Sequence, residues 1–468
     1  MVSDYITWIN DNVLGYILIG ALSFCGIWFT IRTKGVQFRM IGEMFRLLGD
    51  STSTKSKASG QHAISSFQAF AVSVATRVGT GNLAGVATAI AIGGPGSVFW
   101  MWVMALLGAS TAFIESTLGQ LYKERQQESF IGGPAYYISK GLHSKWLAYA
   151  FAILITLTFG LSYNSIQSNT ICSAMNEAFG WNPIIVGAIL TGISLFIVFG
   201  GIKRIANVSS VVVPIMAIGY LILVLVVIAI NIQLIPHVFK VIITNAFGIR
   251  QGIGGTIGMT MIYGIKRGLF SNEAGAGSAP NVAATADISH PVKQGLIQAL
   301  GVFTDTILVC SCTAFIILIS GLYNEPGLNG IALTQAALGS EIGAAGPIFI
   351  AVALFLFAFS SVIGNYYYGE VNIKFMTKSK TVLTIYRLFS AGVVIMLGAM
   401  STLETVWSLG DLTTALLTFC NLIGITGLAK YAFRLLEDYR EQKKRGVKDP
   451  VFHRSQLPEI EQEIESWE

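Results

Sequence analysis

The sequence predicts an all-helical polytopic membrane protein that crosses a bilayer about eleven times. Only 12% of its 468 residues are charged and 53% are hydrophobic, whereas a soluble protein carries about twice that charged fraction. The apolar residues form long blocks such as 211–230, and roughly 18 apolar residues are enough to span a bilayer. Lipid leaves the backbone no hydrogen-bond partners, so only helices or a closed barrel can cross it, and the alternating strands of a barrel are absent from the sequence.

The expected spans have approximate ends. In chain order they are 12–32, 62–93, 96–122, 146–167, 183–201, 205–231, 252–285, 292–321, 346–373, 381–401 and 405–429. The first has its positive charge after it, which is the wrong flank for a cleaved signal peptide, so we keep it as a span. One membrane domain is then expected over 1–440, with 12–32 as an extra N-terminal span, 62–231 and 252–429 as two groups of five, and 441–468 as a C-terminal tail.

The lysines and arginines orient these spans. With eleven crossings, alternate loops and the C-terminal tail hold 27 of the 30 basic residues, with Lys266 and Arg267 counted among them. The opposite side holds only Lys240 and Arg250, and Arg77 lies within a span. Because basic residues concentrate in cytoplasmic loops, we expect a multi-pass plasma-membrane protein with its N-terminus outside and its C-terminus in the cytoplasm. The basic tail is explained by this topology, and nothing else in the sequence indicates nucleic-acid binding.

Two spans do not read as continuous helices. In the second, Gly79, Gly81 and Gly85 surround Thr80 and Asn82. In the seventh, glycines recur from 252 to 277 around polar residues, with a proline at 280. Glycine costs about 1 kcal/mol against alanine in a helix interior, and non-helical backbone is tolerated at membrane depth only where protein or a water-filled cavity covers it. These two spans are therefore the expected location of a binding cavity.

The positions of the two interrupted spans match. Each is the first of its group of five, and the two groups start on opposite sides of the membrane. Paired interrupted helices in inverted halves mark many secondary transporters. The alternative is close helix packing, since small residues at the spacing of Gly81 and Gly85 are common where membrane helices meet. Two polar, glycine-rich clusters at matched positions favour the binding cavity.

An interrupted helix offers free N–H groups from one half and free carbonyl groups from the other, which together suit a zwitterionic amino acid. We expect the backbone N–H groups of Thr80, Gly81 and Asn82 to bind the substrate carboxylate. The ammonium group is expected against polar groups of the seventh span and two amide side chains of the second. These candidate residues are Phe270, Ser271, Asn272, Asn82 and Gln68.

A sodium ion requires hard oxygen ligands. Ser360 and Ser361 lie together within an apolar stretch of the ninth span. With the backbone carbonyls of Ala75 and Val78 they form a candidate Na⁺ site. The alternative for each serine is a hydrogen bond to its own helix, which is the ordinary fate of a membrane serine.

Four charged residues fall inside spans, where charge is costly and usually functional: Arg77, Glu115, Glu273 and Asp305. Pairing of Arg77 with Glu115, or of Glu273 with Lys266 or Arg267, would instead be structural, and we favour that for Glu115. The histidines and cysteines are scattered without metal-ligand spacing, and no phosphate-binding loop or potassium-filter sequence is present. An enzyme, a built-in ATPase and an organic cofactor are therefore not expected.

Several long motifs resemble the alanine or glycine:cation symporter family. They are GTGNLAGVATAIAIGGPGSVFWMWVMALLG, IGGPAYYISKGL, YGIKRGLFSNEAGAGSAPN and the serine pair of the ninth span. The resemblance covers about residues 10–440. It implies a leucine-transporter-type fold, cotransport of alanine or glycine with Na⁺, alternating access, and a substrate held at the two interrupted spans. A proton-coupled carrier, an ion channel and a non-transporting sensor are the alternatives that the residues themselves leave open.

Overall fold

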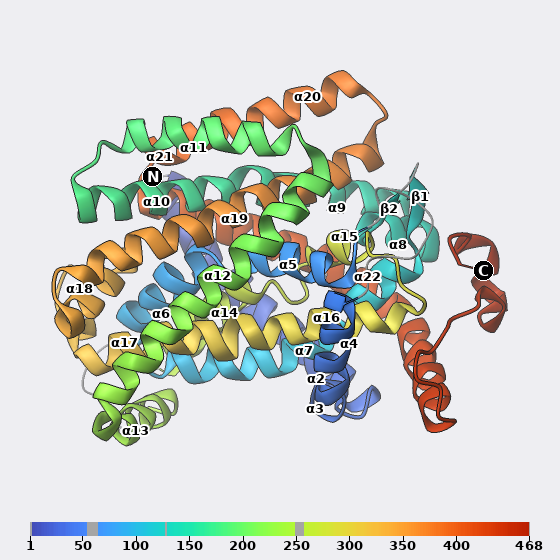
Figure 1. Cartoon of the computed structure of the whole chain (residues 1–468), viewed down its shortest axis with the longest axis horizontal. Helices are drawn as coiled ribbons and strands as arrows, with labels where there is room; N and C mark the ends of the chain where they lie inside the picture. The colour runs from blue at the N-terminus through green and yellow to red at the C-terminus, as the bar shows by residue number, and fades with distance from the viewer. Residues whose placement is uncertain (1, 54–63, 127–128, 249–256, 468) are drawn as a thin grey trace.

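The computed structural model describes residues 2–53, 64–126, 129–248 and 257–467. They fold almost entirely into helices, with one short antiparallel hairpin of β1 (Glu124–Gln126) and β2 (Ser129–Ile131). In Figure 1 most long helices run roughly parallel across the view, and the C-terminal segment lies at one end of the bundle, near β1, β2 and α8. The all-helical membrane fold expected from the composition is confirmed.

The helices are bounded as follows. The first are α1 (Val2–Ile9), α2 (Gly15–Arg32), α3 (Val36–Arg39), α4 (Ile41–Ser53), α5 (Ser66–Arg77), α6 (Val86–Gly93), α7 (Ser97–Leu121), α8 (Pro134–Gly141), α9 (Lys145–Leu157), α10 (Asn164–Phe179) and α11 (Pro183–Val198). The others are α12 (Gly201–Ile230), α13 (Ile235–Ala246), α14 (Ile257–Asn272), α15 (Ala279–Ala283), α16 (Pro291–Val302), α17 (Ser311–Ser320), α18 (Gly330–Ile342), α19 (Ala345–Met376), α20 (Lys380–Leu388), α21 (Val394–Met400) and α22 (Leu403–Lys444).

Wider, π-helical turns join several of these helices end to end. They are Asn10–Leu14, Gly81–Gly85, Thr158–Tyr163, Phe303–Cys310 and Phe389–Val393. Shorter 3₁₀ turns lie at Ile232–Leu234, Leu322–Asn324, Arg454–Gln456 and Pro458–Glu463. A π-helical turn contains one residue more than the α-helix needs and is common at functional sites.

Within the described residues, eight helical stretches are long and apolar enough to cross a membrane. They are Ile6–Arg32, Ser97–Leu121, Lys145–Phe179, Gly201–Ile230, Pro291–Ser320, Ala345–Met376, Lys380–Met400 and Glu404–Lys444. Each coincides with an expected span, although the helices over 145–179 and 404–444 run well beyond the expected ends. The other three expected spans contain shorter helices, and the starts of two of these, 62–63 and 252–256, lie outside the described residues.

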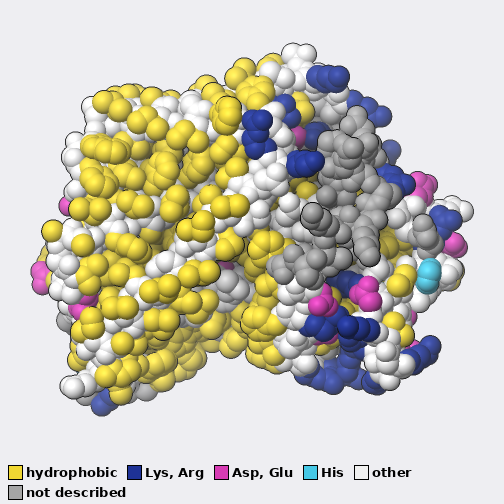
Figure 2. Space-filling view, viewed as in Figure 1, with side chains coloured by type: hydrophobic (Ala, Val, Ile, Leu, Met, Phe, Trp, Pro, Cys, Tyr) yellow, Lys and Arg dark blue, Asp and Glu magenta, His cyan; other side chains and the backbone are white. Residues whose placement is uncertain are grey.

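The surface separates into an apolar region and a basic end. Hydrophobic side chains cover most of the face in Figure 2, and Lys and Arg gather where Figure 1 shows α8 and the C-terminal segment. On α12, the side chains of Ile215, Ile218 and Ile222 are each more than half exposed, as befits a surface that faces lipid. We call the end of the molecule around α8 and residues 449–467 the basic end.

Two basic residues do not lie where the sequence indicated. Lys266 and Arg267 are buried on α14, so they belong to no loop, and the count on the basic side falls from 27 to 25. Arg267 forms an ion pair with Asp411 on α22, at 2.5 Å, and not with Glu273. A sequence count cannot distinguish a charge after a span from one paired inside it, because pairing within the bundle depends on which helices are neighbours.

Candidate functional site

The first interruption lies between α5 and α6. After Arg77 the backbone leaves the helix at Val78, whose φ and ψ are −78° and 94°. The Asn82 side chain then closes the turn, because its Oδ1 accepts the N–H of Gly79 at 2.9 Å. The N–H and hydroxyl of Thr80 both donate to Oε1 of Gln167 on α10, at 3.0 and 2.7 Å. Neutral side chains therefore satisfy the backbone that the interruption leaves free.

Close approach of neighbouring groups requires the glycines of this interruption. A Cβ added to Gly79 would lie 2.4 Å from Oγ of Ser361, and one added to Gly81 would lie 2.9 Å from the Phe270 ring. Neither glycine has a positive φ. They are needed because α19 and α14 press directly against the backbone here.

The structure brings the four residues of the candidate Na⁺ site together. Oγ of Ser361 lies 2.9 Å from the carbonyl oxygen of Ala75 and 3.4 Å from that of Val78, and Oγ of Ser360 lies 3.3 Å from that of Ala75. Both hydroxyls also reach the carbonyl of Phe357 in their own helix, at 2.8 and 3.1 Å. Each serine hydroxyl therefore makes the ordinary hydrogen bond within its own helix and also lies in a cluster of hard oxygens. These oxygens are ligands that fit a sodium ion.

The second interruption lies between α14 and α15. Its backbone turns through Glu273, Gly275 and Gly277, with φ of 56°, 90° and 78°. Glycine adopts such positive φ freely, whereas glutamate does so at a cost. Glu115 on α7 accepts the N–H groups of Gly275 and Gly277, at 3.4 and 3.1 Å, and Asn421 donates to it at 2.8 Å. A buried carboxylate therefore holds this turn.

Asp305 joins the two interruptions. Its carboxylate accepts Nδ2 of Asn82 at 2.7 Å from the first and Oγ of Ser271 at 2.6 Å from the second. Thr306, which also donates to Asp305 at 2.8 Å, accepts Nδ2 of Asn272 at 3.2 Å. Two expected site residues, Asn82 and Ser271, thus bind one buried acid directly, and a third, Asn272, reaches it through Thr306. The sequence singled out Asp305 as a costly charge without indicating what it bridges.

Phe270 closes the space beside the first interruption. Its ring centre lies 4.4 Å from that of Tyr163 and 4.5 Å from that of Trp407. A cavity of about 20 Å³, lined by Phe270 together with Asp411 and Thr414 of α22, lies next to it. This volume suits about one water molecule, so this cavity beside Phe270 is too small for an amino acid.

Gln68 lies apart from these residues. Its Oε1 accepts the N–H of Ser65 at 3.0 Å, its own N–H donates to the Ser65 hydroxyl, and its Nε2 donates to Asn207. This reciprocal arrangement is a helix N-cap. About 14 Å of helix separates it from the interruption at 1.5 Å per residue, so the structure does not bring Gln68 to the other candidates.

Arg77 is the cation shared by the buried acids. It is 2% exposed and interacts electrostatically with Glu115, Glu273 and Asp305. Its Nη1 donates to the carbonyl of Gln298 at 3.1 Å. Its Nε and Nη2 have no hydrogen-bond partner among the described residues. The expected pairing with Glu115 is thus electrostatic and shared with two further carboxylates.

A helical bundle with paired interruptions, hard oxygens at one and buried acids between them, defines a polytopic membrane transporter, not an enzyme. The chain belongs to the sodium:alanine symporter family, whose model matches residues 1–454. It is 51% identical to the amino-acid carrier protein AlsT of Bacillus subtilis, over 100% of this chain and 96% of that protein. It is 49% identical to the probable sodium/glutamine symporter GlnT of the same organism, over 98% and 94%.

A solved structure shows the same fold. A variant of the manganese transporter of Eremococcus coleocola matches 77% of this chain and 79% of its own, with a TM-score of 0.50 and 14% sequence identity. At that identity the likeness is one of fold alone.

Proposed function

We propose that this chain carries a small neutral amino acid, alanine or glycine, into the cell together with Na⁺ by alternating access. The observation that carries the proposal is the cluster of serine hydroxyls and backbone carbonyls that joins α19 to the first interruption. Membership of the sodium:alanine symporter family supports both the ion and the class of substrate.

The proposed architecture is of the leucine-transporter type, with eleven crossings. One extra N-terminal span over 12–32 precedes two inverted groups of five over 62–231 and 252–429, within a single transporter domain of residues 1–440. The basic end is proposed to face the cytoplasm, with the N-terminus outside and the tail over 441–468 inside. The gathering of Lys and Arg at one end of the molecule supports this orientation (Figure 2).

The proposed substrate site lies between the two interruptions. The N–H groups of Thr80, Gly81 and Asn82 bind the substrate carboxylate. A carboxylate that accepts the N–H of Thr80 replaces Gln167, which accepts it in this structure. The ammonium group binds among Asn82, Ser271 and Asn272 and the backbone of Phe270, next to the Asp305 carboxylate. The ring of Phe270 lies against Gly81, so we expect the substrate held there to have a small side chain.

The order of events follows from these contacts. Sodium bridges Ala75 and Val78 to Ser360 and Ser361 and so fixes α5 against α19 in the outward-open state. The amino acid then binds both interruptions and closes the site. Rocking of the bundle opens it to the cytoplasm, where Na⁺ and substrate leave.

Uptake into proteoliposomes tests this function. We expect ¹⁴C-alanine to accumulate when Na⁺ is high outside, and accumulation to stop when the Na⁺ gradient is removed or Li⁺ replaces Na⁺. Unlabelled glycine should compete with alanine for uptake, and leucine should not. Competition by unlabelled glutamine would show that this chain also binds the amino acid named for GlnT. Accumulation that ignores Na⁺ but follows an imposed pH gradient would replace the proposal with a proton-coupled carrier.

A further inference from the structure

The last residues of the described chain fold back onto the basic end of the bundle. We call residues 449–467 the clasp. Phe452, Leu457, Ile460, Ile464 and Trp467 are buried there, whereas a free tail would leave them in water. The family model ends at residue 454, so four of these five apolar side chains lie beyond it.

Trp467 anchors the clasp to the end of α7. Its indole N–H donates to the carbonyl oxygens of Gln120 and Leu121, at 3.2 and 3.1 Å. The ammonium of Lys123 lies 4.4 Å from its ring centre, and the Phe452 ring packs edge-on at 5.4 Å. The C-terminal carbonyls of a helix otherwise lack partners, so Trp467 satisfies groups that α7 exposes.

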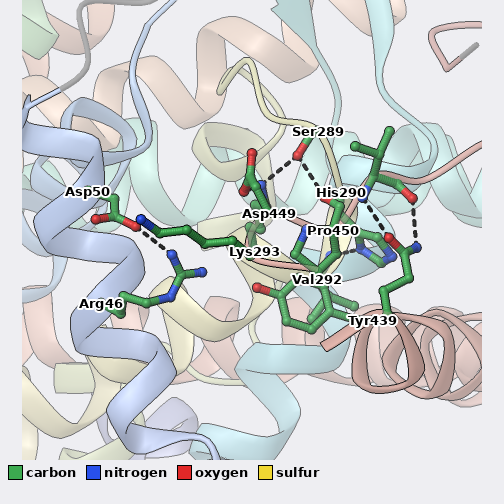
Figure 3. Close-up of polar contacts among 12 residues, drawn as sticks. Arg46, Asp50, Ser289, His290, Val292, Lys293, Tyr439, Asp449 and Pro450 are labelled. Carbon is green, nitrogen blue, oxygen red and sulfur yellow. Dashed lines mark hydrogen bonds and ion pairs between the residues drawn. The ribbon is translucent and has the colours of Figure 1, made fainter. Parts of the chain in front are cut away.

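A second set of contacts holds the segment between α15 and α16 (Figure 3). Ser289 donates its hydroxyl to the carbonyl of Pro450 at 2.8 Å, and its own carbonyl accepts the N–H of Phe452 at 2.9 Å. Lys293 pairs with Asp449. The clasp is therefore bonded on both sides of the start of α16.

His290, the N-cap residue of α16, connects this segment to α22. Its Nδ1 accepts the N–H of Val292 at 3.2 Å, and its Nε2 lies 3.1 Å from Asp438. Its ring also contacts Phe452 and Tyr439. Burial lowers the pKa of His290 more than Asp438 raises it, so the neutral imidazole remains available as the cap of α16.

The contacts continue from the clasp to both interrupted helices. Nε2 of Gln120, whose carbonyl binds Trp467, donates to the carbonyl of Ala286 at 2.9 Å. Ala286 follows α15 and pairs with Ile64, two residues before α5 begins, and the N–H of Asp287 donates to the Ile64 carbonyl at 3.3 Å. The halves of the two interrupted helices nearest the basic end thus meet where the clasp is attached.

We propose that the clasp holds the basic ends of α5 and α15 together, and that it must loosen before the site opens toward that end. Opening on this side separates α5 from α15 and so breaks the pairing of Ile64 with Ala286. The clasp opposes this step because it fixes Gln120 and Ser289 on either side of the pair. That this opening is the inward one rests on the proposed function.

Thiol labelling at Ser73 tests the proposal without transport. Ser73 is fully buried on α5, one turn before Arg77 toward the basic end, and S73C changes one atom. A water-soluble maleimide applied to the purified S73C protein should react at least about fivefold faster when the chain also stops after Lys448 or carries Trp467→Ala, because the reactive state is a minor population that the clasp suppresses. The protein without S73C corrects for its own cysteines.

Val451→Ala is the matched control, since this side chain lies within the clasp and is 42% exposed. It should leave the labelling rate unchanged. Trp467→Phe keeps an aromatic ring but removes the five-membered ring of the indole with its N–H, so an intermediate rate is expected. Equal labelling of the truncated, Trp467→Ala and Val451→Ala proteins, each monodisperse in detergent, would overturn the proposal.

Transport gives a second readout. If inward opening becomes easier, the outward state that binds external alanine is less populated, and the KM for uptake should rise about threefold in the truncated protein. A labelling increase without any alanine uptake by the parent would refute the proposed substrate and leave the clasp supported. A normal parent uptake with unchanged labelling would refute the clasp alone.

Discussion

The two interruptions both contain glycines, but for different reasons. At the first, Gly79 and Gly81 have ordinary φ, and neighbouring side chains leave no room for a Cβ. At the second, Gly275 and Gly277 have φ of 90° and 78°, which a side chain would strain. The first interruption needs glycine because neighbouring side chains lie close to its backbone. The second needs glycine because its backbone has positive φ.

The two interruptions also differ in the charge of their hydrogen-bond partners. Neutral groups, Gln167 and the serine pair, contact the backbone of the first interruption directly, and a carboxylate or an ion can replace them at modest cost. The buried carboxylate of Asp305 reaches this interruption only through the Asn82 side chain. The second is bound to the buried carboxylate of Glu115, whose loss leaves charge-assisted bonds unmade. We therefore expect changes at the second interruption to reduce stability, and changes at the first to reduce transport.

The largest effect is expected for Glu115→Ala. It removes the acceptor of two backbone N–H groups and of Asn421, and breaking such a buried charged network costs about 3–5 kcal/mol. Thermal unfolding in detergent measures it. Glu115→Gln retains an acceptor and should lose less. Were Glu115→Ala as stable as the parent, the second interruption would not depend on this acid.

Gly275→Ala should cost about 1–3 kcal/mol of stability, because alanine is strained at this positive φ. Gly219→Ala on α12 is the control, since a Cβ there meets nothing within 4 Å, and it should unfold at the parent temperature or above. The same unfolding assay applies. A loss no greater than that of the control would show that the second turn can relax.

Ser361→Ala should raise the Na⁺ concentration for half-maximal uptake about tenfold, equivalent to about 1.4 kcal/mol, with little change in Na⁺-free unfolding. Ser173→Ala on α10 removes a hydroxyl that bonds its own helix at Asn169 and should leave Na⁺ dependence unaltered. A Na⁺ response identical in the two variants would remove Ser361 from the ion site.

Gly81→Ala is expected to have the smallest effect, because its nearest contact is the edge of the Phe270 side chain, which can shift more readily than backbone. The added methyl would lie 2.9 Å from the Phe270 ring and displace it toward the substrate. Uptake of alanine should fall about threefold relative to glycine, as measured by competition in one liposome preparation. An equal fall for both substrates would indicate that Gly81 shapes the fold and not the size of the site.

Much of this arrangement follows from local sequence. Glycines interspersed with polar residues at membrane depth indicate both interruptions. A serine pair within an otherwise apolar stretch indicates hard oxygens for sodium, which the carbonyls of Ala75 and Val78 could complete. The reason for each glycine was not predictable. Composition cannot tell whether a glycine is needed for a positive φ or for a close neighbour. The close neighbours here, Ser361 and Phe270, come from helices distant in the sequence.

Other residues carried no signal that spacing could detect. Gln167 stands in α10 among many polar residues, and only its position beside Thr80 distinguishes it. The sequence predicts Gln68 at the substrate as an amide side chain of the second span that could bind the ammonium group, but helix capping places it at the start of α5. The sequence does not predict burial of the C-terminal residues either, because the basic residues of the tail over 441–468 are explained by the topology.

The π-helical turn at Thr158–Tyr163 has a consequence for how this chain tolerates change in length. Such a turn holds one residue more than an α-helix needs, so one deletion within it would restore an unbroken α-helix and leave Gln167 facing Thr80. A deletion in a regular helix such as α12 would instead rotate everything after it by about 100°. The turn at Thr158–Tyr163 is therefore a place where this chain can lose a codon while Gln167 keeps its position.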